Sequence, residues 1–218
     1  MNEIILMSDP EVAAVPVREC GEPLVDVRAD GRLLVDGRKD DDSGGACGRL
    51  RLGVLERLVQ AQALLPDGLR LLYVEGYRPP SLQRRYFEEY AEGLRAANPG
   101  WPPAQVHRQA SRYVSPPDIA PHSAGAAVDL TLADARGREL DLGTRMNASP
   151  EESAGACYTD APGIADEARA NRALLGRVLA SAGLVNYPTE WWHWSYGDRY
   201  WALMSGADAA CYGPREQV

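Results

Sequence analysis

The sequence predicts a mixed α+β fold, because strand and helix patterns both recur along the chain. Two largely apolar runs, residues 69–74 and 126–132, are typical of buried strands. Three other stretches repeat apolar residues at helical spacing, in residues 52–62, 82–94 and 168–182. A chain that contains both patterns belongs to neither the all-α nor the all-β class.

The first half of the chain contains further, weaker signals. Residues 24–28 alternate in polarity as a short strand would. Residues 37–48 are charged and rich in glycine and offer nothing to bury, so we expect a mobile loop there. The first helix should end at Pro66-Asp67-Gly68. Ser81 can cap the second helix, which should stop at Asn98-Pro99-Gly100.

The second half predicts one short helix, a hairpin, a long loop and a final helix. The short helix should run from Pro103 to about Val114. After the second apolar strand a turn leads to residues 139–142, which we expect to pair with that strand. Residues 143–163 have little periodicity, and loops of that length are usually functional or disordered. Gly183 should end the last helix.

Length and composition indicate one domain over residues 1–218, with 45% hydrophobic residues to form its core. The net charge of −8 argues against a nucleic acid or an anionic membrane as partner. We expect a cytoplasmic protein, because no signal peptide or run of transmembrane length is evident. The cysteines form no Cys-x-x-Cys pair and are expected to be free thiols: Cys20, Cys47, Cys157 and Cys211.

Two short segments contain two of the three histidines, each with a carboxylate nearby. The first segment contains His122 and Asp129, and the second, Glu190-Trp191-Trp192-His193, contains Glu190 and His193. A catalytic zinc site takes about three protein ligands and leaves one position for water or substrate. His122, Asp129 and His193 can supply these ligands, and Glu190 would then lie beside the metal as a proton carrier.

The expected local structure is compatible with one shared site. Asp129 lies within the second apolar strand, and His122 lies in the glycine-containing turn before it. Glu190 and His193 are three residues apart in a Trp-rich run that resembles a strand, and such positions face opposite sides of a regular strand. We therefore expect Glu190 at the strand's entry or on a bulge. His107 has no carboxylate at metal spacing and is expected to be a surface residue.

The metal-binding pattern occurs together with Gly76-Tyr77-Arg78-Pro79, and these motifs resemble those of the VanX-type zinc D-alanyl-D-alanine dipeptidases. The resemblance covers roughly residues 50–202 and leaves residues 1–48 as a divergent N-terminal segment. It implies a scaffold shared with zinc D,D-carboxypeptidases and the Hedgehog signalling domain. That scaffold is an α+β fold with a mostly antiparallel central sheet flanked by helices.

The resemblance also implies a role for each motif residue. His122, Asp129 and His193 would hold one zinc ion per chain, Glu190 would be the catalytic base, and Arg78 would stabilise the transition state. The chemistry of these residue types agrees, since zinc lowers the pKa of its water and a nearby carboxylate can take the proton. A fixed guanidinium suits the charge that gathers on the former carbonyl oxygen.

Three residues depart from the family at positions expected to bind substrate. VanX-type enzymes usually have small hydroxyl residues just before the first zinc histidine, near the dipeptide's carboxylate, where this chain has Ala120 and Pro121. Many have an aspartate after the hairpin that holds the substrate ammonium, where this chain has Asn147. We therefore expect weak activity on free D-Ala-D-Ala and a relaxed requirement for free termini.

The sequence thus predicts a zinc hydrolase that cleaves an amide bond in a small peptide, with D-Ala-D-Ala as the default substrate. One alternative is a hydrolase of another short peptide or amide, in a natural-product pathway. Another is a zinc-holding binding protein on the same scaffold. Glu190 favours an enzyme, because a binding module does not need an unliganded carboxylate beside the metal.

Overall fold

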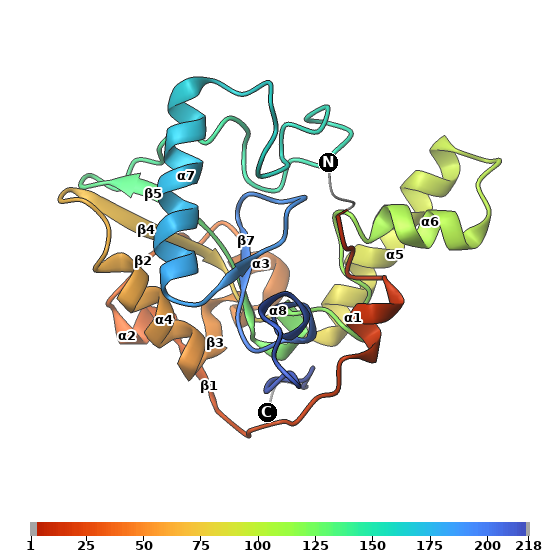
Figure 1. Ribbon diagram of the computed structural model, residues 1–218, viewed down its shortest axis with the longest axis horizontal. Helices are drawn as coiled ribbons and strands as arrows, with labels where there is room; N and C mark the ends of the chain where they lie inside the picture. The colour runs from red at the N-terminus through yellow and green to blue at the C-terminus, as the bar shows by residue number, and fades with distance from the viewer. Residues whose placement is uncertain (1–3, 217–218) are drawn as a thin grey trace.

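The computed structural model describes residues 4–216, apart from the side chains of residues 42 and 43. A five-stranded sheet forms its centre, in the order β2-β4-β5-β7-β6, and only β2 and β4 pair in parallel (Figure 1). The five strands are β2 (Leu34–Val35), β4 (Leu69–Glu75), β5 (Ala127–Asp134), β6 (Val185–Asn186) and β7 (His193–Ser195). A separate antiparallel pair joins β1 (Leu24–Asp26) to β3 (Arg49–Arg51). The predicted α+β class with a mostly antiparallel sheet is confirmed.

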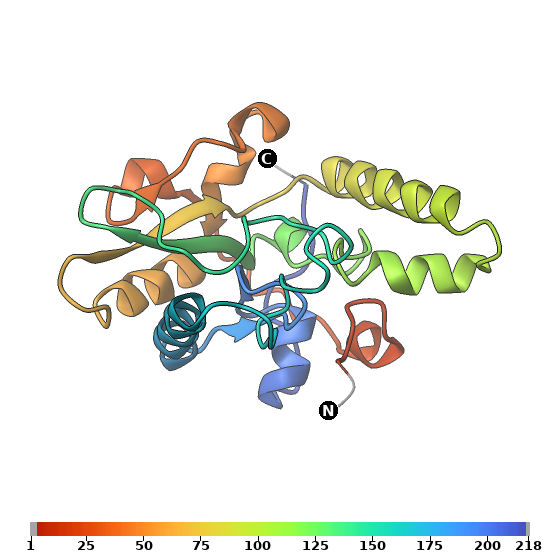
Figure 2. The same cartoon turned by 90° about the horizontal axis from the view of Figure 1, so that it is seen from above.

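Five helices of seven or more residues accompany the sheet in the described part of the chain: α4 (Leu52–Gln62), α5 (Pro80–Ala97), α6 (Pro103–Ala110), α7 (Asp166–Ser181) and α8 (Arg199–Ser205). In both views α5 and α6 project from the end of the molecule opposite α4 and α7 (Figures 1 and 2). Shorter helical turns are α1 (Pro10–Ala14), α2 (Val27–Asp30), α3 (Asp40–Ser43), η1 (Ala46–Gly48) and η2 (His122–Ala124).

The main core lies between the sheet and two helices. Buried side chains of β4 and β5 pack in one cluster with side chains of α4, such as Leu55, and of α7, such as Leu179. Nearly every residue of β5 is buried, and most of its residues are therefore apolar. The polar residues within this strand, Asp129 and Thr131, are therefore exceptions that need a reason.

Several predicted boundaries shift in the structure. The second helix, α5, begins at Pro80, and Ser81 lies inside it without a side-chain cap. Proline suits the first helical position because its missing N–H would have no partner there. The short helix α6 ends at Ala110 rather than near Val114. Glu139 forms only an isolated bridge with Ala133, so the predicted hairpin partner is shorter than expected.

Residues 37–48 differ most from the prediction. They form α3 and η1, and the residues of η1 are buried. The Cys47 carbonyl accepts hydrogen bonds from the backbone N–H of Gly76, at 2.8 Å, and from the Tyr73 hydroxyl. The expectation that this segment has nothing to bury is wrong, because its small residues pack against the end of β4.

Residues 143–163 contain neither helix nor strand, as predicted. Arg172 of α7 stabilises this loop by donating hydrogen bonds to the carbonyls of Leu142, Ala156 and Tyr158 at 2.7 to 2.8 Å. All four cysteines are free thiols, which confirms that prediction. Among residues 4–216, no helix has both the length and the apolar character needed to cross a membrane.

Candidate active site

Three neighbouring strands place polar residues side by side at one end of the sheet. Asp129 of β5 lies opposite His193 of β7 on one side and opposite Glu75 of β4 on the other. Directly opposed residues of paired strands project their side chains to the same face. A register shift between Tyr73 and Glu75 brings Glu75 into this row. Strand pairing thus brings together residues separated by more than fifty positions in the sequence.

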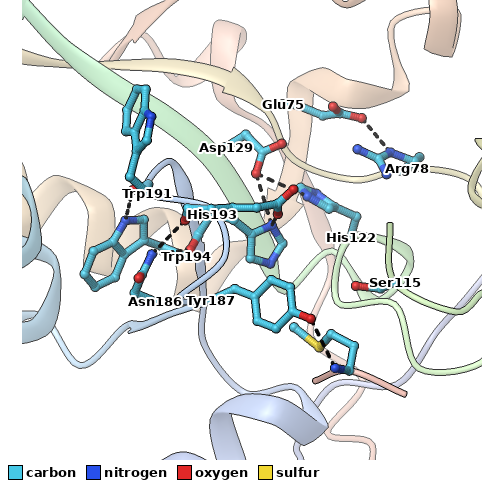
Figure 3. Close-up of polar contacts among 12 residues, drawn as sticks. Glu75, Arg78, Ser115, His122, Asp129, Asn186, Tyr187, Trp191, His193 and Trp194 are labelled. Carbon is cyan, nitrogen blue, oxygen red and sulfur yellow. Dashed lines mark hydrogen bonds and ion pairs between the residues drawn. The ribbon is translucent and has the colours of Figure 1, made fainter. Parts of the chain in front are cut away.

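His122 reaches the same place from η2, just before β5. Its Nδ1 lies 2.6 Å from the carbonyl oxygen of Gly76, which can only accept, so this nitrogen carries the proton. The other ring nitrogen, Nε2, lies 3.4 Å from Asp129 Oδ1. His193 Nδ1 lies 3.1 Å from the same oxygen (Figure 3). One donor atom from each of these three buried residues lies within 4.8 Å of the others.

The three donors fit a metal ion. Two imidazole nitrogens and a carboxylate are a ligand set that zinc accepts in catalytic sites. Burial lowers the pKa of His193 and so favours the neutral imidazole, which is the form that binds metal. Burial alone would raise the pKa of Asp129, but His122 and His193 together hold it well below its ordinary value. Both residues are therefore in the protonation state of a metal ligand.

Glu190 lies beside this triad in a turn that precedes β7. The turn is closed by backbone hydrogen bonds from Glu190 to Tyr187, at 2.9 Å, and from His193 to Glu190, at 3.2 Å. Asn186 donates to the carbonyls of both Glu190 and His193. Glu190 Oε2 comes within 3.8 Å of His193 Nδ1. The expectation that Glu190 lies at the entry of the strand is confirmed, since β7 begins at His193.

The environment of Glu190 favours proton exchange. Burial, followed by the charge of Asp129, raises the pKa of its carboxyl well above the ordinary range. A group that holds a proton more readily than usual can take one from water and release it to a leaving group. The geometry therefore provides a carboxyl next to the metal-binding atoms.

Arg78 lines the same cavity and is firmly held. Its Nε donates to Glu75 Oε1 at 2.7 Å, and its Nη1 donates to Gln83 Oε1 at 2.9 Å. Gln83 is itself fixed by donating to the Ser115 carbonyl at 2.7 Å. The Arg78 guanidinium carbon also lies 5.0 Å from the centre of the Tyr86 ring. These hydrogen bonds are made by Nε and Nη1, not by Nη2, and they fix the plane of the guanidinium.

These groups surround a cavity of about 350 Å³, a size suited to a small-molecule ligand. Its lining residues are Lys39, Arg78, Gln83, Tyr86, Glu89, Tyr90, Tyr113, Val114, Ser115, His122, Asp129, Asn147, Glu190 and His193. The cavity thus joins the predicted metal, base and arginine residues in one space.

Comparison with known proteins agrees with this geometry. The family model described as D-ala-D-ala dipeptidase, of the peptidase M15 group, matches residues 51–205. The chain is 30% identical over 217 residues to a D-alanyl-D-alanine dipeptidase of Synechocystis sp., covering 87% of each protein. The chain belongs to this family.

Other similar proteins are more distant. A D-alanyl-D-alanine dipeptidase of Escherichia coli is 28% identical over 128 residues, which cover 58% of this chain and 55% of that protein. The solved structure of the LdcB LD-carboxypeptidase has a TM-score of 0.48 and 17% identity, covering 86% of this chain and 76% of that one. The structure of VanYB in complex with D-Alanine-D-Alanine has a TM-score of 0.45 and 20% identity, covering 73% of this chain and 79% of that one.

Membership of the D-Ala-D-Ala dipeptidase family makes the chain a metallopeptidase. Of its three departures from the family pattern, only Asn147 lines the cavity. Asn147 adopts the left-handed conformation, with φ of 60°, and its carbonyl accepts a hydrogen bond from the Tyr113 hydroxyl at 2.8 Å. Ala120 and Pro121 are buried and are not among the lining residues. Val114 and Ser115 line the cavity from that part of the dipeptidase instead.

Sequence reasoning missed several groups that complete this dipeptidase site. Glu75 is three residues before Arg78 and next to the quoted motif, so its pairing with the arginine could have been predicted. Gln83 lies at the first turn of α5, where nothing in the sequence distinguishes it from a surface residue. Lys39 belongs to the segment that was expected to be a mobile loop.

Proposed function

We propose that this chain is a zinc dipeptidase that hydrolyses the amide bond of D-alanyl-D-alanine. The observation that carries the proposal is the convergence of His122, Asp129 and His193 within 4.8 Å, with the Glu190 carboxyl 3.8 Å from one of them. Family membership supports the substrate, and the size of the cavity suits a dipeptide. The substrate would connect the protein to cell-wall metabolism.

The two histidines and Asp129 would hold one zinc ion, through His122 Nε2, His193 Nδ1 and the Asp129 carboxylate. When bound, zinc would lower the pKa of a water molecule and polarise the substrate carbonyl. The hydrogen bond from His122 to the Gly76 carbonyl supports this role, because it presents the opposite ring nitrogen in its unprotonated form.

Glu190 would act as general base and then as general acid. Its carboxyl would accept a proton from the attacking water and later deliver it to the nitrogen of the leaving D-alanine. It is buried and adjacent to the ligands without lying among the three convergent donors. A group with this position has a chemical use in an enzyme and none in a protein that only binds metal.

Arg78 would stabilise the negative charge that develops on the former carbonyl oxygen. Its Nε and Nη1 hold Glu75 and Gln83, so Nη2 is the nitrogen that can face the substrate. A donor that is fixed before the reaction does not have to reorganise during it. The buried ion pair with Glu75 therefore serves to orient the guanidinium.

The substrate ammonium would be bound weakly, because Asn147 offers it a neutral amide where a carboxylate would form an ion pair. An N-acylated dipeptide should therefore compete with the free one. This departure is the reason to keep another short peptide or amide as a second candidate substrate. We also propose that residues 1–218 form one zinc peptidase domain that acts in the cytoplasm, on a small peptide rather than on nucleic acid or membrane.

The proposal is tested by the Glu190→Gln variant. It removes the base but no ligand, so zinc content measured by atomic emission should stay near one per chain. The rate of D-Ala-D-Ala hydrolysis, measured by released D-alanine, should fall by about 10² to 10⁴. Glu88→Gln, which removes an exposed carboxylate of α5 outside the cavity, is the control and should keep the full rate. Equal rates in the wild type and Glu190→Gln would refute the role of Glu190, and a wild type without any activity would refute the substrate.

A further inference from the structure

We propose that Lys39 determines substrate specificity by binding the free C-terminal carboxylate of the dipeptide. The inference rests on the proposed function, because it concerns the same cavity and substrate. It assigns a binding residue to the N-terminal segment, which precedes the residues matched by the family model.

The topology of the sheet brings Lys39 to the active site. β2 runs parallel to β4, with Val35 beside Tyr73, so both strands leave the sheet at the same end. The backbone N–H of Asp36 donates to the Tyr73 carbonyl at 2.8 Å and extends this pairing. Lys39 then passes the end of β4, where its Nζ lies 3.9 Å from Glu75 Oε2. The parallel pairing of β2 with β4 thus brings the Lys39 ammonium close to Glu75, the residue that pairs with Arg78.

The backbone at Lys39 is held in place by the next turn. Asp40 begins α3, and its carboxylate accepts hydrogen bonds from the Arg28 guanidinium and from Cys47 Sγ. The Asp40 N–H also donates to the Gly37 carbonyl at 3.1 Å. The Lys39 side chain is 21% exposed and lies with its Nζ 5.6 Å from the centre of the Tyr86 ring. Its ammonium therefore has a defined position on the cavity wall.

Two cationic side chains, Lys39 and Arg78, line the cavity. Arg78 and Lys39 approach the two oxygens of a single carboxylate, Glu75. Arg78 is already held by Glu75 and Gln83 and would serve the reacting carbonyl. An ammonium has three donors, so Lys39 can contact Glu75 and still donate to a ligand.

The substrate carboxylate is the group that matches Lys39. Ala120 and Pro121 are not among the residues that line the cavity. The lining carboxyl groups, those of Glu89, Asp129 and Glu190, would not attract it. The expectation that both substrate ends are weakly bound is therefore revised, because Lys39 serves the carboxylate while Asn147 leaves the ammonium end weak.

The test compares D-alanyl-D-alanine with D-alanyl-D-alaninamide, which lacks the carboxylate, on Lys39→Met. We expect KM for the free acid to rise about tenfold, equivalent to about 1.4 kcal/mol. The kcat for the acid, and both constants for the amide, should stay close to those of the wild type. Lys39→Arg, which keeps the positive charge, should recover most of the affinity for the acid.

Arg38→Met is the matched control. It removes a positive charge from the neighbouring residue, which pairs with Asp36 and Glu139 and does not line the cavity. It should leave KM for both compounds unchanged. A comparable rise in KM for the acid in Arg38→Met would show a general charge effect and overturn the proposal.

Two further results would overturn the role of Lys39: an unchanged KM for the acid, or an equal loss on acid and amide. Failure of the proposed function would be distinct, because the wild type would then hydrolyse neither compound. In that case, the affinities of both compounds are measured by calorimetry on the zinc-loaded Glu190→Gln protein, with and without the Lys39→Met substitution. A tenfold loss of affinity for the acid alone supports Lys39, and equal affinities refute it.

Discussion

The two walls of the cavity are built in different ways. The metal wall consists of His122, Asp129, Glu190 and His193, which lie on paired strands or within a few residues of them. The substrate wall consists of Lys39, Tyr86, Tyr113 and Asn147, which come from four separate loops or helices. The residues of the metal wall match the motifs on which the family resemblance rests, whereas Asn147 departs from that pattern and Lys39 lies before the residues matched by the family model.

The two walls differ because strand pairing fixes the residues of one wall, whereas separate loops and helices supply the residues of the other. Strand pairing defines the position of the metal wall, because a change of register by one residue would turn Asp129 or His193 to the other face. Loop residues have no such constraint, so a change at Asn147 or Lys39 alters one contact without moving the sheet. We therefore expect mutations in the metal wall to remove activity and mutations in the substrate wall to change selectivity.

The largest effect should come from removing a metal ligand. His122→Ala or His193→Ala leaves two of the three donors, so tight zinc binding and with it hydrolysis should be lost. His107→Ala is the matched control, because its ring packs against Phe87 on the α5–α6 hairpin and not at the site. Zinc content after dialysis measures the effect. Stoichiometric zinc in both ligand variants would show that these histidines do not bind the metal.

An intermediate effect is expected for Arg78→Ala, which lies between the two walls. Zinc content should stay near one per chain, while kcat/KM for D-Ala-D-Ala should fall by about 10² or more, the scale of losing one oxyanion donor. The measurement is steady-state kinetics on this variant and on Arg84→Ala, which removes an exposed arginine of α5 that does not line the cavity. A rate like that of the wild type would mean that the oxygen is stabilised by another group.

The smallest effect should come from Asn147→Asp in the substrate wall. A carboxylate here could form a charge-assisted hydrogen bond with the substrate ammonium, worth roughly 1.5 to 3 kcal/mol. We expect kcat/KM for free D-Ala-D-Ala to rise by about tenfold or more and that for N-acetyl-D-Ala-D-Ala to stay the same or fall. The ratio of the two constants is the measurement. An increase for both substrates alike would show that Asn147 does not lie at the ammonium.

The sequence by itself determined the fold class and the residues of the metal wall. The apolar runs that became β4 and β5 are buried on both faces, and such strands are recognisable without knowing their partners. His122, Asp129, Glu190 and His193 were evident because buried histidines beside carboxylates at fixed spacing have few uses other than metal binding. Family motifs added Arg78.

Only the tertiary structure shows which residues form the substrate wall. Lys39 reaches the cavity through the parallel pairing of the two-residue strand β2 with β4, and so short a strand has no sequence pattern. Residues 37–48 were interpreted as a loop because their small residues pack through backbone groups and not through apolar side chains. Ala120 and Pro121 were expected to lie at the substrate from their position before His122, and only the structure shows that both are buried and are not among the lining residues. Contacts between distant segments depend on how the chain returns to the sheet, and local sequence does not encode that path.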